Sequence, residues 1–224
     1  MVKLYKYLRH TPKGSLVLAI VFIGVICRAP AQVYAPIVSL LQNEFAVNYA
    51  TIGLLSGVPV FCYAAFTPLA SWVIGKKGLE YSTMTGVIII GSGICLRMFG
   101  GYAVVLLATI IIGAGIAFTN TVVPLICARD FSNHYAAVTG IYSAMMNFGA
   151  ILASAITMPI TLVLGWRLAI FGWVFVDILV IVFFLAYIYR KKRGASRKLI
   201  ARNKDHKSDE WTRLIEIDKE DLTG

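Results

Sequence analysis

Long runs of apolar residues, separated by five short polar or glycine-rich breaks, fill the chain up to residue 189. A helix rises 1.5 Å per residue, so crossing a hydrocarbon core of about 30 Å takes about 20 residues, and each run is long enough to do so. The pattern predicts an all-α, polytopic membrane protein. Six spans are expected, near residues 15–40, 51–74, 81–99, 102–126, 136–161 and 166–189.

The same pattern divides the chain into three parts: a basic N-terminus (1–14), a six-helix transmembrane bundle (15–189) and a basic, then mixed-charge tail (190–224). A basic segment before an apolar run is also typical of a signal peptide. However, Arg28 and Pro30 stand where a cleavage site needs small residues, so we interpret the first run as a retained span.

Composition agrees with a lipid environment, because 58% of the residues are hydrophobic and only 14% are charged. The net charge of +10 does not indicate nucleic acid, since eleven of the twenty-one Lys and Arg follow residue 189 and most others flank apolar runs. Eighteen lie on one side of the predicted topology, whereas the loops on the other side hold only Arg167. The positive-inside rule then predicts a protein of the cell membrane with both termini in the cytoplasm.

Residues that would support metal or enzyme chemistry are scattered. The four cysteines occur singly, no histidine lies near them, and HExxH and GxSxG motifs are missing. We therefore predict no metal, no cofactor and no enzymatic activity.

Arg28 is the charge that most needs an explanation. It lies about twelve residues into the first span, about 18 Å deep, where a guanidinium costs about 3 kcal/mol or more. Pro30 and Pro36 follow it and loosen the helix, and broken helices line cavities. Gln32, one turn on, shares its face. Arg28 therefore binds either a solute anion or a structural partner such as a carboxylate or helix-end carbonyls.

Two further charges fall within predicted spans. Arg97 is near the outer end of the third span, where its side chain could instead reach the interface. Asp177 is central in the sixth span, among apolar residues that disfavour its ionised form. It is interpreted as a proton-coupling site, as the salt-bridge partner of Arg28, or as an idle carboxyl group.

Two asparagines complete the candidate site. Asn120, one turn before Pro124, offers a donor and an acceptor to a cavity, or else makes an interhelical hydrogen bond. Asn147 belongs to a stripe of mainly small and polar residues in the fifth span that should face another helix or a cavity, a packing seam being the plainer interpretation. The stripe comprises Gly140, Ala144, Asn147, Ile151 and Ser154.

Five fragments, in order along the spans, carry a family resemblance: Arg28-Ala29-Pro30 with Pro36, Pro59-Val60-Phe61-Cys62 with Thr67-Pro68-Leu69-Ala70, Leu96-Arg97, the stretch 112–126, and Arg129-Asp130-Phe131 with Thr139-Gly140-Ile141-Tyr142-Ser143. Together they resemble the cyanate permease-like (CynX/NimT) branch of the major facilitator superfamily. The resemblance implies a gradient-driven permease for a small anionic or polar solute, with Arg28, Arg97 and Asn120 at family positions. Thr109 stands where the superfamily usually has a fourth-span arginine.

Superfamily members have two six-helix halves with the solute bound between them. We expect this chain to be one half, acting as a half-length or truncated permease that associates with itself or with a second half. The alternative is a non-transporting membrane scaffold or regulatory subunit, or an inactive truncated product.

Overall fold

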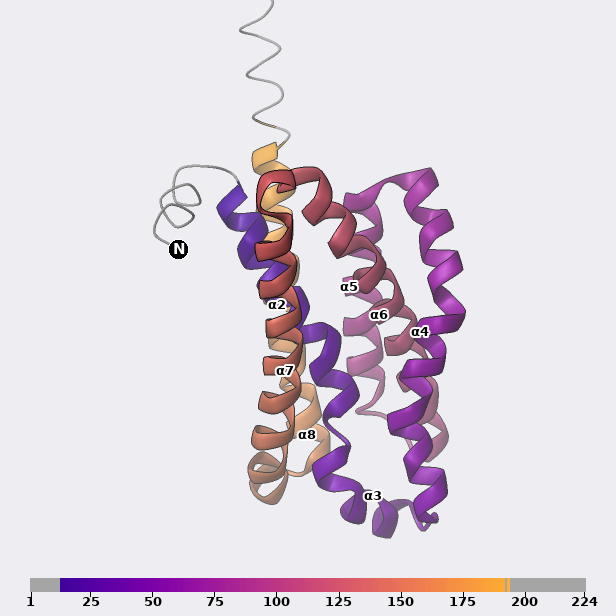
Figure 1. The fold of residues 1–224 in the computed structure, drawn as a ribbon. Coiled ribbons are helices and arrows are strands. Elements are labelled where there is room, and N and C mark those ends of the chain that lie inside the picture. Colours follow the sequence, from indigo (N-terminus) through magenta and orange to yellow (C-terminus); the bar gives the residue numbers. More distant parts are fainter. Residues whose placement is uncertain (1–12, 192, 194–224) are drawn as a thin grey trace, which may run out of the picture.

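The computed structural model describes residues 13–191 and 193, and its ordered elements there are all helical (Figure 1). The predicted N-terminal segment 1–14 and tail 190–224 lie almost wholly outside these residues. The elements are α2 (Lys13–Gln32), η1 (Ala35–Ile37), α3 (Val38–Phe45), α4 (Tyr49–Lys77), α5 (Leu79–Leu96), α6 (Tyr102–Asp130), η2 (Ser132–His134), α7 (Tyr135–Leu164), α8 (Trp166–Phe171) and a last helix over 173–191.

Six helical segments in the described part of the chain are long and apolar enough to cross a membrane, as the sequence predicted. They run over Leu16–Phe45, Ala50–Lys77, Leu79–Leu96, Tyr102–Asp130, Ser132–Leu164 and Trp166–Lys191. The observed bounds differ from the expected ones by up to five residues, and two of these differences have a clear structural reason or bear on a candidate residue. The first segment extends to Phe45 because a second short helix follows its break, and the third ends at Leu96 rather than at residue 99.

The break in the first segment follows from one of its prolines. Pro36 has no amide hydrogen, so it cannot donate to the carbonyl of Gln32, where α2 ends. The chain turns through residues 33–34, forms the short helix η1, and resumes as α3. The break lies one helical turn beyond Arg28. Both prolines were expected to loosen the helix, but α2 stays helical through Pro30, and only Pro36 stands at the break.

The chain then reverses direction between α3 and α4. Ala46 adopts a left-handed conformation with φ of 51°, which ends α3. Asn48 caps α4, because its side-chain oxygen accepts a hydrogen bond of 2.8 Å from the amide of Thr51. The polar break expected between the first two spans therefore ends in a helix start with a defined cap.

The helices form two groups that enclose the middle of the bundle. α5 packs along α6, α6 along α4, and α2 along α7, while α2 also contacts α6 and so joins the groups. Figure 1 shows both described ends of the chain at one end of the bundle, here called the terminal end. α3 and the turn between α7 and α8 lie at the opposite end.

Close approach of α5 and α6 depends on glycine at the contact. A Cβ added to Gly115 would lie 2.7 Å from the carbonyl oxygen of Gly86, a distance that real Cβ atoms do not reach. Small residues let helices pack closely in lipid, where no hydrophobic force drives them together. This contact holds α6, and with it Asn120, against the rest of the bundle.

Ionic contacts join helices at both ends of the bundle. At the terminal end, Arg129 of α6 lies 2.7 Å from Glu80 of α5, and Lys191 of the last helix also contacts Glu80. At the opposite end, Glu44 of α3 lies 2.5 Å from Arg167 of α8. The first and last helical segments are thereby connected, although far apart in sequence.

Candidate functional site

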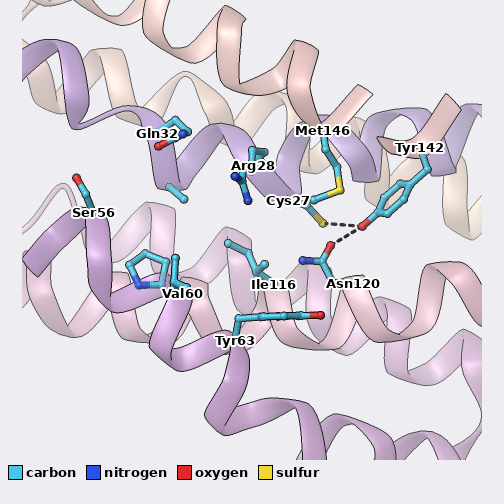
Figure 2. A pocket seen from close by; sticks show the side chains of 12 residues that line it. Cys27, Arg28, Gln32, Ser56, Val60, Tyr63, Ile116, Asn120, Tyr142 and Met146 are labelled. Carbon is cyan, nitrogen blue, oxygen red and sulfur yellow. Dashed lines mark hydrogen bonds between the residues drawn. The ribbon is translucent and has the colours of Figure 1, made fainter. Parts of the chain in front are cut away.

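A cavity of about 430 Å³ opens between α2, α4, α6 and α7 (Figure 2). Its volume lies within the range typical of small-molecule sites. Both groups of helices contribute to its walls. The lining residues are Cys27, Arg28, Ala31, Gln32, Ser56, Pro59, Val60, Tyr63, Ile116, Asn120, Tyr142 and Met146.

Arg28 and Gln32 enter this cavity from α2, as their spacing of four residues predicted. Figure 2 shows the Arg28 side chain directed from α2 toward the side formed by α4 and α6, with Gln32 further along α2. The Arg28 side chain is exposed to this space. Among the described residues, no hydrogen bond or ion pair engages its guanidinium, which leaves its donors free for a solute.

Asn120 reaches the cavity from α6 and meets a tyrosine of α7. The hydroxyl of Tyr142 donates to Asn120 Oδ1 over 2.5 Å and also lies 3.7 Å from the sulfur of Cys27. Tyr142 is 4% exposed, so this hydroxyl is enclosed by protein. The interhelical hydrogen bond and the cavity position, posed as alternatives for Asn120, both occur.

Sequence reasoning did not select Tyr142 as a site residue. Its only signal was its place in the fragment Thr139-Gly140-Ile141-Tyr142-Ser143, which carried part of the family resemblance. Tyr142 does not belong to the stripe that drew attention to α7, and an intramembrane tyrosine is usually a packing residue.

Asn147 lies elsewhere. It is exposed, its amide donates over 3.0 Å to the carbonyl of Ser143 in the same helix, and it is not among the residues that line the cavity. The stripe that contains it is exposed too, with Ile151 at 65%. No described residue of this chain covers that face, so the expected neighbouring helix is not part of the described bundle.

Arg97 is buried behind the cavity rather than in its wall. Arg97 is 1% exposed, so its side chain is enclosed by neighbouring helices rather than extended along the surface of the bundle. Nη1 donates over 2.6 Å to the carbonyl of Pro30, Nη2 over 3.1 Å to Thr109, and the guanidinium lies 4.5 Å from the centre of the Tyr34 ring. Arg97 thus binds the end of α2 beside the helix break.

Asp177 does not pair with Arg28 in the described structure, so that interpretation of the two charges is wrong. The carboxyl group is 3% exposed and packs against Gly91 of α5. Its Oδ1 has no hydrogen-bond partner among the described residues. The other interpretations of Asp177, as a proton-coupling site or an idle group, stay predictions.

Comparison with known proteins identifies the fold. A family model described as Major Facilitator Superfamily matches residues 20–216. The chain belongs to the Major Facilitator Superfamily. It is therefore a multi-pass membrane protein of a transporter family and not an enzyme.

Three relatives place it more closely. It is 31% identical to the "2-nitroimidazole transporter" of Escherichia coli K12 over 68% of this chain and 39% of that protein. It is 27% identical to the "Uncharacterized transporter YycB" of Bacillus subtilis 168 over 70% and 40%, and 24% identical to the "Cyanate transport protein CynX" of E. coli K12 over 63% and 37%. The resemblance to the cyanate permease-like branch is confirmed, and the matched region spans about two fifths of each relative's length.

Proposed function

We propose that this chain is the solute-binding six-helix unit of a permease that works by alternating access, and that its solute is small and anionic or rich in electronegative atoms. The observation that carries the proposal is the Arg28 guanidinium, which faces the cavity without a partner among the described residues. A cation at this depth costs about 3 kcal/mol, and a bound anion would offset that cost.

The other polar groups of the cavity agree with such a solute. Gln32 and Asn120 carry amide N–H groups, and Ser56 and Tyr63 carry hydroxyls, so donors surround the space in front of Arg28. A guanidinium binds planar anions through two parallel hydrogen bonds. Cyanate and 2-nitroimidazole, which appear in the names of two relatives, are both small and expose electronegative atoms, which supports the same class for this chain.

Transport is tested on Arg28 with the purified chain in proteoliposomes. We expect Arg28→Ala to abolish uptake of labelled cyanate or 2-nitroimidazole, and Arg28→Lys to reduce it about tenfold or more, because an ammonium keeps the charge but loses the planar fork. Arg167→Ala is the matched control, since Arg167 lies at the opposite end of the bundle, outside the cavity.

Size-exclusion profiles and thermal midpoints must show that the variants are folded. Equal flux through folded wild-type and Arg28→Ala proteins would refute the permease proposal and would favour a non-transporting scaffold. Superfamily membership does not depend on that result.

A second six-helix unit, supplied by another copy of this chain or by another half, completes the cavity in this proposal. Superfamily members bind solute between two halves. The helices α4 and α7 that flank the cavity keep apolar side chains exposed, such as Phe61 at 78%. A photo-crosslinking amino acid at position 61 should trap such a unit, whereas one at Phe175, 67% exposed on the last helix, should label lipid. Equal protein cross-linking from both positions would contradict a specific interface.

The proposed location is the cell membrane, with both termini in the cytoplasm. The support is the concentration of Lys and Arg on one side of the six spans. Fusions of a cytoplasm-active fluorescent protein and of a periplasm-active phosphatase to either terminus test it. Phosphatase activity at either terminus would overturn this orientation.

A further inference from the structure

A hydrogen-bonded chain of side chains runs from the backbone of α6 to the cavity, and its first link fixes the direction of the rest. The hydroxyl oxygen of Thr119 lies 3.1 Å from the carbonyl oxygens of Gly115 and Ile116, one turn earlier in α6. A carbonyl can only accept, so the Thr119 proton is directed to the backbone. The Thr119 oxygen is thereby left to accept from its other neighbour.

That neighbour is Cys27 of α2, whose sulfur lies 3.0 Å from the Thr119 oxygen. Since the Thr119 proton is already committed, the thiol hydrogen of Cys27 must be the donor between them. The sulfur therefore presents only lone pairs to the hydroxyl of Tyr142, 3.7 Å away. The sulfur can then accept from Tyr142 but not donate to it, so the single Tyr142 proton has two acceptors within reach, this sulfur and the Asn120 side chain.

The distance between Tyr142 and Asn120 shows where that proton goes. The hydroxyl oxygen and the Asn120 side-chain atom that faces it are 2.5 Å apart. This separation belongs to O–H···O hydrogen bonds, whereas N–H···O bonds are usually about 2.7 to 3.2 Å long. The amide oxygen of Asn120, not its nitrogen, therefore faces Tyr142.

With its oxygen held, Asn120 has only its amide nitrogen left for the cavity. Figure 2 shows this nitrogen on the side of the amide that faces away from Tyr142, toward Ile116 and Arg28. Gln32, Ser56 and Tyr63 can rotate to donate or to accept, because no side-chain hydrogen bond to another described residue fixes them. Asn120 is fixed, and together with Arg28 it presents donors.

We propose that Tyr142 is a specificity-determining residue: by binding the carbonyl of Asn120, it makes the cavity prefer solutes that accept hydrogen bonds over solutes of the same shape that donate them. The orientation of Asn120 is a property of the free protein, whereas the preference among solutes rests on the proposed function. The two parts are tested separately.

The orientation is tested on the full chain in nanodiscs, labelled with ¹⁵N-asparagine, with Asn120→Asp used to assign the side-chain signal. We expect both Asn120 amide protons to exchange freely with water in the wild-type protein and in Tyr142→Phe. An amide proton that is protected in the wild type and released in Tyr142→Phe would show that the nitrogen faces Tyr142, and would overturn the inference whatever the protein transports.

The preference is tested with acetate and acetamide, which share a planar shape. Acetate is an anion that only accepts hydrogen bonds, whereas acetamide is neutral and carries N–H donors. Because Arg28 is present in every variant, the effect of the charge cancels when the ratio is compared between variants. In Tyr142→Phe the Asn120 amide is free to turn its oxygen to the solute, so the ratio of acetate to acetamide affinity, measured by titration, should fall about tenfold. Tyr135→Phe is the matched control, because it removes a hydroxyl from the same helix, α7, at an exposed residue that does not line the cavity, and its ratio should equal that of the wild type.

An unchanged ratio in Tyr142→Phe, with both probes bound by the wild type, would show that Tyr142 does not set the preference. An equal fall in Tyr135→Phe would also refute it, since the loss of a hydroxyl outside the cavity would then suffice. If the wild type bound neither probe, the proposed solute class would be contradicted, and the amide exchange experiment would still decide the orientation of Asn120.

Discussion

Two arginines in the same bundle show how neighbours decide what a buried cation does. Arg28 projects into a cavity and makes no hydrogen bond or ion pair with the described residues, whereas Arg97 is enclosed and bound on three sides by Pro30, Thr109 and Tyr34. The carbonyl of Pro30 belongs to the last turn of α2, where helical acceptors lose their partners and cations are stabilised by the helix dipole. Arg97 therefore supports the broken helix that carries Arg28.

We expect Arg97→Ala to destabilise the protein by about 2 to 3 kcal/mol, because it leaves a buried carbonyl and a buried hydroxyl without their charged donor. Arg97→Lys should recover only part of this loss, since an ammonium lacks the planar fork that reaches Pro30 and Thr109 together. Thermal midpoints in detergent measure the effect. Arg167→Ala, a change at a half-exposed ion pair, should cost less than about 1 kcal/mol. Comparable losses in Arg97→Ala and Arg167→Ala would contradict this role.

At the same scale, the sequence could predict what depends on local spacing. Arg28 and Gln32 share a helix face because they are four residues apart, and Asn120 was indicated by its polar character within an apolar run. Tyr142 could not be selected, since its importance arises from contacts with Asn120 and Cys27, 22 and 115 residues away in sequence. Asn147 shares a helix face with the other residues of its stripe, but spacing does not reveal which face of α7 meets the rest of the chain.

The elements of the bundle depend on a few contacts that spacing alone does not reveal. The six spans follow from apolar length, and the interruption of the first follows from Pro36. The packing partners of each helix do not, because six similar apolar helices offer many arrangements of comparable burial. The contact between α5 and the last helix is one example, where Gly91 makes room for the carboxyl group of Asp177.

A Cβ at Gly91 would overlap the carboxyl group of Asp177. We therefore expect Gly91→Ala to destabilise the protein by about 1 to 3 kcal/mol. Asp177→Ala removes the obstructing group, and the double variant should therefore lose less stability than the sum of the two single variants. Unfolding midpoints of the four proteins complete the cycle. Gly57→Ala serves as the control, because nothing lies within 4 Å of the added Cβ. Additive effects of Gly91→Ala and Asp177→Ala would refute the contact.

For the molecule as a whole, the two ends of the bundle are tied by separate ionic contacts. Glu80 joins α5 to α6 and to the last helix at the terminal end, while Glu44 joins α3 to α8 at the opposite end. Transporters of this architecture move largely by rocking one helical unit against another around a fixed site. A unit that rocks must itself stay rigid. Ionic contacts at both ends would keep Arg28 and Asn120 in fixed positions relative to each other.

Removal of either ionic contact should therefore increase amide exchange only at its own end of the bundle. Glu80→Gln should increase amide exchange near residues 77–82 and 127–131, and Glu44→Gln near residues 42–48 and 164–168, each at a cost below about 1 kcal/mol because the pairs are partly exposed to solvent. Since the two sites share no partner, their effects on the unfolding midpoint should add in the double variant. Hydrogen exchange followed by mass spectrometry, with the midpoints, measures both.

Exchange that rises at the terminal end in Glu44→Gln would mean that the ends are coupled through the bundle, and the unit would then flex internally rather than move as one body.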